Sequence, residues 1–481
     1  MNAKMIRYMI GKMLGVEALV LLIPTLVALY YQEAVAKSFL LTAFVLFCAY
    51  VILGRTRPKD SNIYSKEGLF VVALAWVLWS AFGALPFFLS GITSHYIDAL
   101  FEMVSGFTTT GATIISNVNE LPHAINFWRA FSQWIGGMGV LVFAMMLTSL
   151  GEKSSMVLVR AEVTGVDKNK LLPKARQSSL ILYIMYWGLT LVVFICLLLG
   201  GMSPFDSVMH ALSTAATGGA SNYVEGVAHF NSAYIEGVMS VFMILFGINF
   251  NVYFLLFFGE RKSIFKNEEL KVYLLMVATS VVVVTISLFS TIGEPLKAFR
   301  DASFQVASMI STTGAVSTNY NAWSEFAKII LLFLMIVGAC ASSTGGGIKV
   351  SRMMILFKNI KNEIKQMLHP KSINLLKVNG ERVSNQAMKS IYTFLGAYLA
   401  ILVCSVLIIS LDNFNFETTT TAVLSALSNI GPGFGSIGPA GNYAGFSFLS
   451  KIVLCLNMLV GRLEIFSFLI LFTPLMRTRK F

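Results

Sequence analysis

Charged residues are scarce in this chain, and their scarcity argues against an ordinary soluble protein. Only 12% of the 481 residues are charged, whereas soluble globular domains carry about 25%. Hydrophobic residues make up 56% of the chain, and its mean hydropathy is +0.73. Water is therefore not the main solvent for most of the surface. We expect one large helical membrane domain rather than several soluble domains.

Clustered metal ligands and catalytic motifs are also lacking. The five cysteines and five histidines are scattered, without the spacing of a disulfide framework or of a structural metal site. The sequence contains no HExxH motif, no ATP-binding motif and no pair of carboxylates within one apolar segment that would suit catalysis. We therefore expect neither an enzyme nor an ATP-driven pump, and no organic cofactor.

Apolar segments of roughly 20 residues, long enough to cross a bilayer as helices, occur ten times. Strand-like alternation is missing from these segments, and a helix satisfies its own backbone groups in lipid, so we expect an all-α polytopic membrane protein. The ten segments are 9–31, 36–54, 69–90, 124–150, 178–200, 232–258, 270–293, 326–347, 388–411 and 446–473.

The basic residues indicate an orientation. The formal net charge is +12, and clusters of Lys and Arg recur after every second apolar segment, at 55–66, 153–176, 261–271 and 349–389 among others. Basic loops are retained on the cytoplasmic side. We therefore expect both termini in the cytoplasm, and the same bias explains the net charge without a nucleic-acid partner.

Four shorter apolar pieces lie in the connections on the opposite side. They cover residues 96–107, 204–216, 298–311 and 415–428, and each is too short to span the membrane, so we expect re-entrant helices buried inside the protein. An acidic residue lies where each helix is expected to begin, which suits the positive end of the helix dipole. These residues are Asp98, Asp206, Asp301 and Glu417.

Each short piece ends in a Ser/Thr-rich stretch with a glycine, so the four stretches read as repeats. They are SGFTTTGAT (105–113), ALSTAATGGA (211–220), SMISTTGAV (308–316) and SALSNIGPG (425–433). An ungapped alignment of these stretches places one glycine from each in register. The aligned glycines are Gly111, Gly218, Gly314 and Gly431.

Four such segments around one axis would suit the passage of a cation. Glycine permits backbone angles closed to other residues, backbone carbonyls can replace the hydration shell of an ion, and the carbonyl ends of helices favour positive charge. The alternative, Gly/Ser/Thr motifs that merely pack membrane helices, is disfavoured by four copies in register. The predicted ion-binding residues are Thr109, Thr110, Gly111, Ala216, Thr217, Gly218, Thr312, Thr313, Gly314, Asn429, Ile430 and Gly431.

These motifs resemble the Trk/Ktr/HKT superfamily of potassium transporters over essentially the whole chain, and the two extra N-terminal helices resemble its TrkH-type branch. The resemblance implies four pseudo-symmetric M1–pore helix–M2 repeats around one pore, with one glycine per repeat in a potassium filter. Gly111 stands where some sodium-conducting plant members have serine, which favours potassium, and rubidium should also permeate. The resemblance further implies a homodimer in a bacterial inner membrane, regulated by a cytoplasmic nucleotide-binding ring of TrkA type.

The expected division of the chain follows from these repeats. Residues 1–66 would form the two extra helices, and residues 67–152, 153–260, 261–370 and 371–481 would form the four repeats. The basic loops 153–176 and 349–389 are the expected docking sites for the regulatory ring.

A glycine-rich stretch, GACASSTGGGIK (338–349), interrupts the third repeat. Such a stretch at membrane depth should be an unwound loop inside the protein, and a loop under a filter could gate the ion path; the alternative is a simple kink. Similar loops in the family support a gate. The expected gating residues are Gly338, Gly345, Gly346, Gly347 and Lys349, together with Arg462.

Ionisable residues inside apolar segments are costly and usually face a wet interior. Arg462 and Glu464 lie inside segment 446–473, so we expect Arg462 to hold the loop through its carbonyls or to act as a positive barrier, with a structural ion pair as the alternative. A matching arginine in the family faces the pore. Arg129 and Lys451 are expected to be anchors or ion-pair partners.

Two functions remain open at this point. The first is a gated potassium uptake protein driven by the membrane potential, of which 100 mV supplies about 2.3 kcal/mol per monovalent cation; channel-like flow and H⁺- or Na⁺-coupled symport both fit it. The second is a secondary transporter of an organic solute with broken helices. Inverted repeats would place some re-entrant pieces on the other side, whereas all four are expected on one side here.

Overall fold

The computed structural model describes residues 2–59, 64–139, 175–259, 264–371 and 375–472. Within these ranges, six helical segments are long and apolar enough to cross a membrane, or eight if two sharply bent pairs each count as one. The fold is thus that of a helical membrane protein. The long segments contain α1 (Ala3–Val20), α2 (Leu22–Tyr30), α3 (Ala36–Gly54), α4 (Ser65–Gly83), α5 (Leu85–Leu89), α10 (Ala175–Leu199), α15 (Glu268–Ile292) and α19 (Asn385–Ile409).

Several helices begin where a short polar side chain precedes an apolar run. The side-chain oxygens of Asn267, Ser324, Ser384, Asn415 and Ser447 each accept a hydrogen bond from a backbone N–H in the first turn of the helix that follows. Such caps satisfy donors that have no partner within the helix. The ends of these helices are therefore encoded locally.

Four short helices of 12 to 16 residues lie where the sequence predicts half-length pieces, with bounds that differ by at most three residues. One detail of the prediction is wrong. Asp301 does not begin its helix, because that helix starts at Pro295 and places Asp301 in its second turn, beyond most of the helix-dipole benefit. The short helices are α6 (Tyr96–Phe107), α11 (Pro204–Ala216), α16 (Pro295–Ile310) and α20 (Phe416–Ser428).

A further helix follows each short helix, and it stops earlier than predicted. The continuous spans expected at 232–258 and 446–473 are each broken, with bends of 91° and 116° between their two halves. The third helix gives way to the predicted loop, and residues 140–150 of the predicted span 124–150 lie outside the described residues. These helices are α7 (His123–Gly137), α12 (Ala233–Phe246), α17 (Glu325–Val337) and α21 (Phe448–Arg462), with α13 (Phe250–Phe258) and α22 (Phe466–Leu469) beyond the two bends.

The breaks are stable because the freed backbone groups are bonded inside the protein. The N–H of Cys340 donates to the carbonyl of Gly247 at the end of α12 (3.0 Å), and the N–H of Lys349 donates to the carbonyl of Val337 at the end of α17 (2.9 Å). Irregular backbone within a membrane domain is tolerated under this condition. Apolar length alone could not reveal these breaks.

The short helices are held in a closed circuit. Each following helix packs on the next short helix along the chain: α7 on α11, α12 on α16 and α17 on α20, while α21 returns to α6. Ion pairs reinforce three of these contacts. They are Glu236–Arg300 (3.1 Å), Lys328–Glu417 (3.5 Å) and Lys451–Asp98 (2.7 Å).

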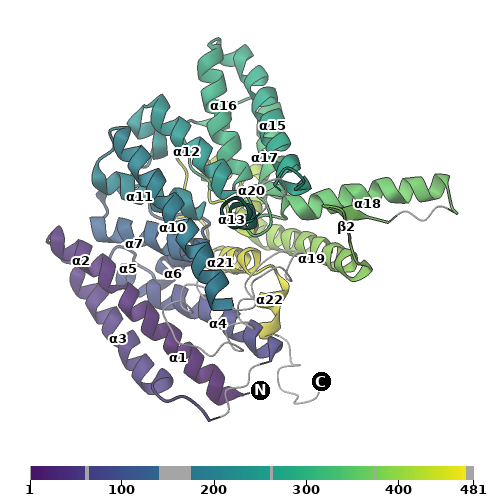
Figure 1. The fold of residues 1–481 in the computed structure, drawn as a ribbon. Helices are drawn as coiled ribbons and strands as arrows, with labels where there is room; N and C mark the ends of the chain where they lie inside the picture. Colours follow the sequence, from purple (N-terminus) through teal and green to yellow (C-terminus); the bar gives the residue numbers. More distant parts are fainter. Residues whose placement is uncertain (1, 60–63, 140–174, 260–263, 372–374, 473–481) are drawn as a thin grey trace.

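Two parts lie outside this circuit in Figure 1. The first is the N-terminal group of helices, in which α1 and α3 touch backbone to backbone: a Cβ atom on Gly11 would lie 2.3 Å from the nitrogen of Gly54. The second projects from the opposite side and consists of α18 (Val350–Leu368), the hairpin of β1 (Lys377–Val378) and β2 (Glu381–Arg382), and the start of α19.

Short 3₁₀ helices complete the described structure. Three of them, η1, η2 and η3, lie between a short helix and the helix that follows it, as does η5 in the last unit. Their bounds are η1 (Val118–Glu120), η2 (Gly226–Phe230), η3 (Tyr320–Ala322), η4 (Ser410–Asp412), η5 (Gly435–Ile437) and η6 (Ile470–Phe472).

Candidate functional site

Four glycines, one after each short helix, meet and form what we call the glycine ring. Their φ angles are 75° at Gly111, 68° at Gly219, 70° at Gly314 and 100° at Gly431, in the region that favours glycine. A Cβ atom on any of them would lie 1.8 to 2.5 Å from a carbonyl oxygen of the neighbouring segment, where no side chain fits. These oxygens, the ring carbonyls, belong in that order to Gly218, Thr313, Ile430 and Thr110.

The ring corrects the register of the second repeat by one residue. Two positions before each ring glycine the backbone is left-handed, at Thr109, Thr217, Thr312 and Asn429. The equivalent of Gly111 is therefore Gly219, and the predicted set Ala216, Thr217 and Gly218 shifts to 217–219. Ala216 is only the last residue of α11.

A signal for the correct register was present in the sequence. Each short helix carries a serine six residues before its ring glycine. The carbonyl of this serine accepts a hydrogen bond of 2.8 to 3.0 Å from the N–H of the residue before the ring glycine. Aligning the serines would have selected the second glycine of the Gly218-Gly219 pair. The serines are Ser105, Ser213, Ser308 and Ser425.

A cavity of about 100 Å³ lies on the side of the ring that faces away from the short helices, and all four ring glycines line it. Hydrogen bonds join the segments around it from one unit to the next and close the mouth of the ring as a circuit. They include Arg129 Nη1 to Ser221 O (3.2 Å), Val227 N to Val316 O (2.8 Å), Tyr320 Oη to Gly433 O (3.0 Å) and Tyr443 N to Thr113 O (2.8 Å).

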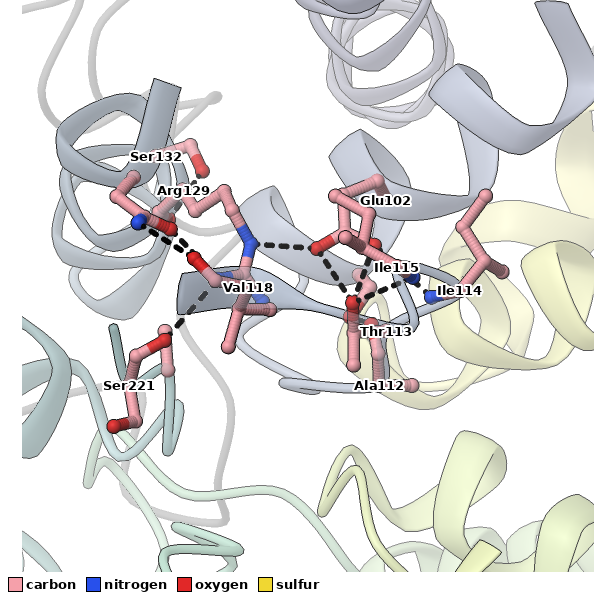
Figure 2. A network of polar contacts seen from close by, with 12 residues as sticks. Glu102, Ala112, Thr113, Ile114, Ile115, Val118, Arg129, Ser132 and Ser221 are labelled. Carbon is pink, nitrogen blue, oxygen red and sulfur yellow. Dashed lines mark hydrogen bonds and ion pairs between the residues drawn. The ribbon is translucent and has the colours of Figure 1, made fainter. Parts of the chain in front are cut away.

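A buried ion pair stands at this mouth (Figure 2). The Arg129 Nε donates to Glu102 Oε1 at 2.7 Å, and the two side chains are only 7% and 3% exposed. The Glu102 carboxylate also accepts from the Thr113 hydroxyl and from the N–H of Ile114. The pair therefore fixes the backbone just after Gly111. Arg129 and Lys451 are both in ion pairs, one of the two roles expected from the sequence.

The stretch 338–349 is non-helical, as predicted, and lies against the other side of the ring. A Cβ atom on Gly345 would be 2.7 Å from the carbonyl oxygen of Ser311, and one on Gly346 would be 2.1 Å from that of Ser428. The N–H of Gly346 donates to the Thr312 hydroxyl at 2.6 Å. The loop is therefore in direct contact with the carbonyl ends of α16 and α20.

The ends of this loop are also held. Gly338 has a φ of 71°, and its Cα lies 2.8 Å from where a Cβ on Gly347 would be. The N–H of Ala341 donates to Glu269 Oε1 of α15 at 2.7 Å. Lys349 is buried, with 5% exposure, and its ammonium group donates a hydrogen bond to the carbonyl oxygen of Gly345. The predicted gating residues of the loop thus lie together in one small region.

Arg462 reaches the same region from the end of α21. Its guanidinium donates to the carbonyl oxygens of Thr344 (2.6 Å), Gly136 (2.6 Å) and Gly137 (2.7 Å). It therefore connects the loop to the end of α7, as one of the two roles predicted for it requires. Glu464 pairs with Arg352 of α18 at 2.7 Å.

Two residues that sequence reasoning did not single out also belong to the site. Glu102 is the buried partner of Arg129, and its acidic character within the apolar piece 96–107 was a usable signal. Gln133 of α7 bonds a ring carbonyl, that of Gly218, at 2.9 Å. A glutamine in the middle of an apolar helix gave only a weak signal.

Comparison with known proteins identifies the family. The TrkH family, described as a cation transport protein, matches residues 35–481. The chain belongs to the TrkH family. The TrkH family includes the Trk system potassium uptake protein TrkH of Salmonella typhimurium, to which the chain is 33% identical over 480 residues, covering 98% of this chain and 99% of that protein.

Other members of the TrkH family agree in sequence and in structure. The Trk system potassium uptake protein TrkG of Escherichia coli is 32% identical, with 98% of each chain covered. The crystal structure of the potassium transporter TrkH from Vibrio parahaemolyticus superposes with a TM-score of 0.90 at 31% identity, covering 99% of this chain and 100% of that one. These relatives are named as transport proteins and not as enzymes.

Proposed function

We propose that this chain is a potassium uptake protein in which K⁺ crosses the membrane through the glycine ring. The observation that carries the proposal is the closure of the ring, in which four glycines each stand against a carbonyl oxygen of the neighbouring segment. Carbonyl oxygens in this arrangement can replace the hydration shell of K⁺, and Rb⁺ should follow the same path. The relatives named above are potassium uptake proteins.

The proposed filter consists of the three residues up to and including each ring glycine. This assignment keeps the predicted residues in three repeats and uses the corrected register in the second. The proposed filter is chemically asymmetric, because the ring carbonyls belong to three different residue types, at Thr110, Gly218, Thr313 and Ile430. The proposed filter residues are 109–111, 217–219, 312–314 and 429–431.

The proposed gate is the loop 338–349, held by Arg462. The loop lies directly against the carbonyl ends of two short helices on one side of the ring, so an ion leaving the ring on this side would meet it. The Arg462 guanidinium adds a positive charge there, which opposes a cation. Conduction would require the loop to move away from Thr312 and Arg462.

The cavity at the ring argues against the organic-solute alternative. Its volume is about 100 Å³, whereas pockets for small organic ligands usually measure about 300–1,000 Å³. A monovalent cation with a few water molecules is a better match for this space.

The finer architecture belongs to the same proposal. Each unit would consist of a first long helix, a re-entrant short helix and a broken second helix, arranged with pseudo-symmetry around one pore, and α1–α3 would be the extra helices. The divisions at residues 66, 152, 260 and 370 are proposed with it. The charge pattern supports a multi-pass protein with both termini in the cytoplasm, and the bacterial relatives support a bacterial inner membrane as its location.

The proposed partners are a second copy of the chain and a nucleotide-binding ring of TrkA type. The projecting unit of α18, β1, β2 and the start of α19 presents several lysines and covers most of the basic stretch 349–389, which makes it the proposed docking surface. The other proposed docking stretch, 153–176, lies largely outside the described residues.

The mode of transport is a separate question. Channel-like flow moves one charge per K⁺ ion across the membrane, whereas symport with H⁺ or Na⁺ moves more than one, so the two modes differ in the charge that accompanies each K⁺ ion.

A direct test is uptake of Rb⁺ or K⁺ by a bacterium that lacks its own uptake systems. The chain should restore growth at low potassium, and Gly431→Ser should lower the K⁺/Na⁺ preference, because its Cβ would lie 2.5 Å from the carbonyl oxygen of Thr110. No uptake, with the protein present in the membrane, would count against the proposed function. An unchanged K⁺/Na⁺ preference in Gly431→Ser would count against the filter assignment.

A further inference from the structure

Gln133 of α7 binds the second repeat at three points around its filter residues. Its side-chain Nε2 donates to the ring carbonyl of Gly218 at 2.9 Å, and its Oε1 accepts from the N–H of Ala220 at 3.3 Å and from the hydroxyl of Ser213 at 3.1 Å. The side chain is only 3% exposed. One buried amide thus brackets the ring glycine from both sides.

The other three segments are held differently, each by the serine of its own short helix. The hydroxyls of Ser105, Ser308 and Ser425 donate to a backbone carbonyl at or just after the ring glycine, at 2.6 to 2.7 Å. The corresponding hydroxyl of Ser213 donates to Gln133 instead. In the second repeat a tether from another helix therefore replaces the internal one.

The helices that follow the four short helices also differ from one another at the position of Gln133. The eleventh residue of α7 is Gln133, whereas the eleventh residues of α12, α17 and α21 are Met243, Met335 and Met458, all fully buried. Methionine fills space but offers only a weak acceptor. The amide at this position is therefore confined to one of the four helices.

Gln133 also explains the glycine at position 218. The equivalent residues Thr110, Thr313 and Ile430 carry side chains, but a Cβ atom on Gly218 would lie 2.5 Å from Gln133 Oε1. Its φ angle is outside the left-handed region, so no backbone strain requires glycine here. The amide of Gln133 occupies the space that a side chain at 218 would fill.

We propose that Gln133 is a positioning residue that sets the K⁺/Na⁺ selectivity of the ring. The inference rests on the proposed function, because it gives the Gly218 carbonyl oxygen a role in holding the ion. Gln133 fixes the position of that oxygen relative to α7 while donating one hydrogen bond to it. Selectivity depends on the number, field strength and freedom of the coordinating carbonyls.

Loss of this tether should favour sodium. Without Gln133, the Gly218 carbonyl loses the side-chain donor that binds it, and the N–H of Ala220 loses its acceptor. The Gly218 carbonyl could then move inward around the smaller Na⁺. One net hydrogen bond of about 1 kcal/mol corresponds to roughly a fivefold change in relative permeability.

The test compares Na⁺ and Rb⁺ fluxes of purified protein in liposomes, normalised to folded protein. Gln133→Met introduces the residue found in the other three helices, and we expect the Na⁺/Rb⁺ flux ratio to rise roughly fivefold. A merely structural role would lower both fluxes together and leave the ratio unchanged. Met458→Leu, at the equivalent position of α21, is the matched control and should keep the wild-type ratio.

A second pair of variants tests the shared space. Gly218→Thr alone should abolish transport, because its Cβ would collide with Gln133, whereas Gly218→Thr combined with Gln133→Met should recover it, since the pair reproduces Thr313 with Met335. Failure of the double variant to exceed the single variant would overturn the spatial part of the argument.

The outcomes separate this inference from the proposed function. If wild-type protein conducts no Rb⁺, the proposed function fails. If wild-type protein is selective and Gln133→Met conducts with an unchanged ratio, only the role of Gln133 is refuted. If Gln133→Met does not conduct, the melting temperature of wild type and variant is measured in K⁺ and in Na⁺. Wild type should be stabilised more by K⁺ than by Na⁺. Loss of this preference in the variant supports the role of Gln133, and an unchanged preference overturns it.

Discussion

Arg462 and Thr344 are joined by a hydrogen bond of 2.6 Å between a guanidinium nitrogen and a backbone carbonyl oxygen, although 118 residues separate them in the chain. The same guanidinium bonds two carbonyls at the end of α7. It thus ties the loop under the ring to a helix of the first repeat. A closed state that depends on this tie should respond to its removal.

Arg462→Gln should raise the Rb⁺ flux of purified protein in liposomes. Hydrogen bonds to charged groups contribute about 1.5–3 kcal/mol each, so losing one or two of them should raise the open fraction at least about tenfold. Arg462→Lys is the control, because it retains the charge but not the planar fork, and it should show a smaller increase. Equal fluxes in wild type and Arg462→Gln would refute this role.

Gly346→Ala should displace the loop from the ring. The added Cβ would lie 2.1 Å from the carbonyl oxygen of Ser428, which is backbone and cannot turn aside. We expect a higher basal Rb⁺ flux than wild type shows. Gly396→Ala on α19 is the control, since a Cβ there meets nothing within 4 Å; a flux that rises equally in both variants would contradict the prediction.

Gly219→Ala should abolish Rb⁺ transport, in keeping with the corrected register. The new Cβ would lie 2.2 Å from the carbonyl oxygen of Thr313, at a φ of 68°. Gly293→Ala separates the cost of the positive φ from the clash with a carbonyl oxygen, because Gly293 has a φ of 76° but open space around its Cβ position. That control should cost about 1 kcal/mol of stability and leave transport intact. Normal transport by Gly219→Ala would exclude Gly219 from the ring.

Glu102 and Arg129 should behave as a coupled pair in thermal unfolding. Breaking a buried ion pair from one side costs about 3–5 kcal/mol, because the remaining charge is left unpaired. Glu102→Gln and Arg129→Met should each lower the melting temperature in detergent, and the double variant should lose less than the two losses combined. Strict additivity would show that the two residues act independently.

The half-length pieces were predictable from sequence because their cause is local. Each is an apolar run of limited length, and two begin after a polar cap, Ser203 or Asn415, that can be read in the chain. The breaks in the following helices were missed, because segments 232–258 and 446–473 remain apolar across their bends. There the bent path depends on partners such as Gly247 and Cys340, which meet only in the folded chain.

The register error has a similar cause. Two adjacent glycines follow Thr217, and an alignment on the Thr-Gly pairs selects the first, whereas the second, Gly219, adopts the positive φ. The hydrogen bond from Gly218 N to Ser213 O decides it, since it ends the short helix as in the other repeats. Gln133 then fills the space beside Gly218.

The sequence by itself determined the helical membrane class, the four short pieces, three of the four ring glycines and the unwound loop, because hydropathy, segment length and glycine content are properties of short stretches. The tertiary structure decided which carbonyl meets which glycine and which partners Gln133 and Arg462 have. These contacts join residues far apart in the chain, up to 326 positions for Arg462 and Gly136. Their geometry depends on how the helices close on one another, which no local pattern records.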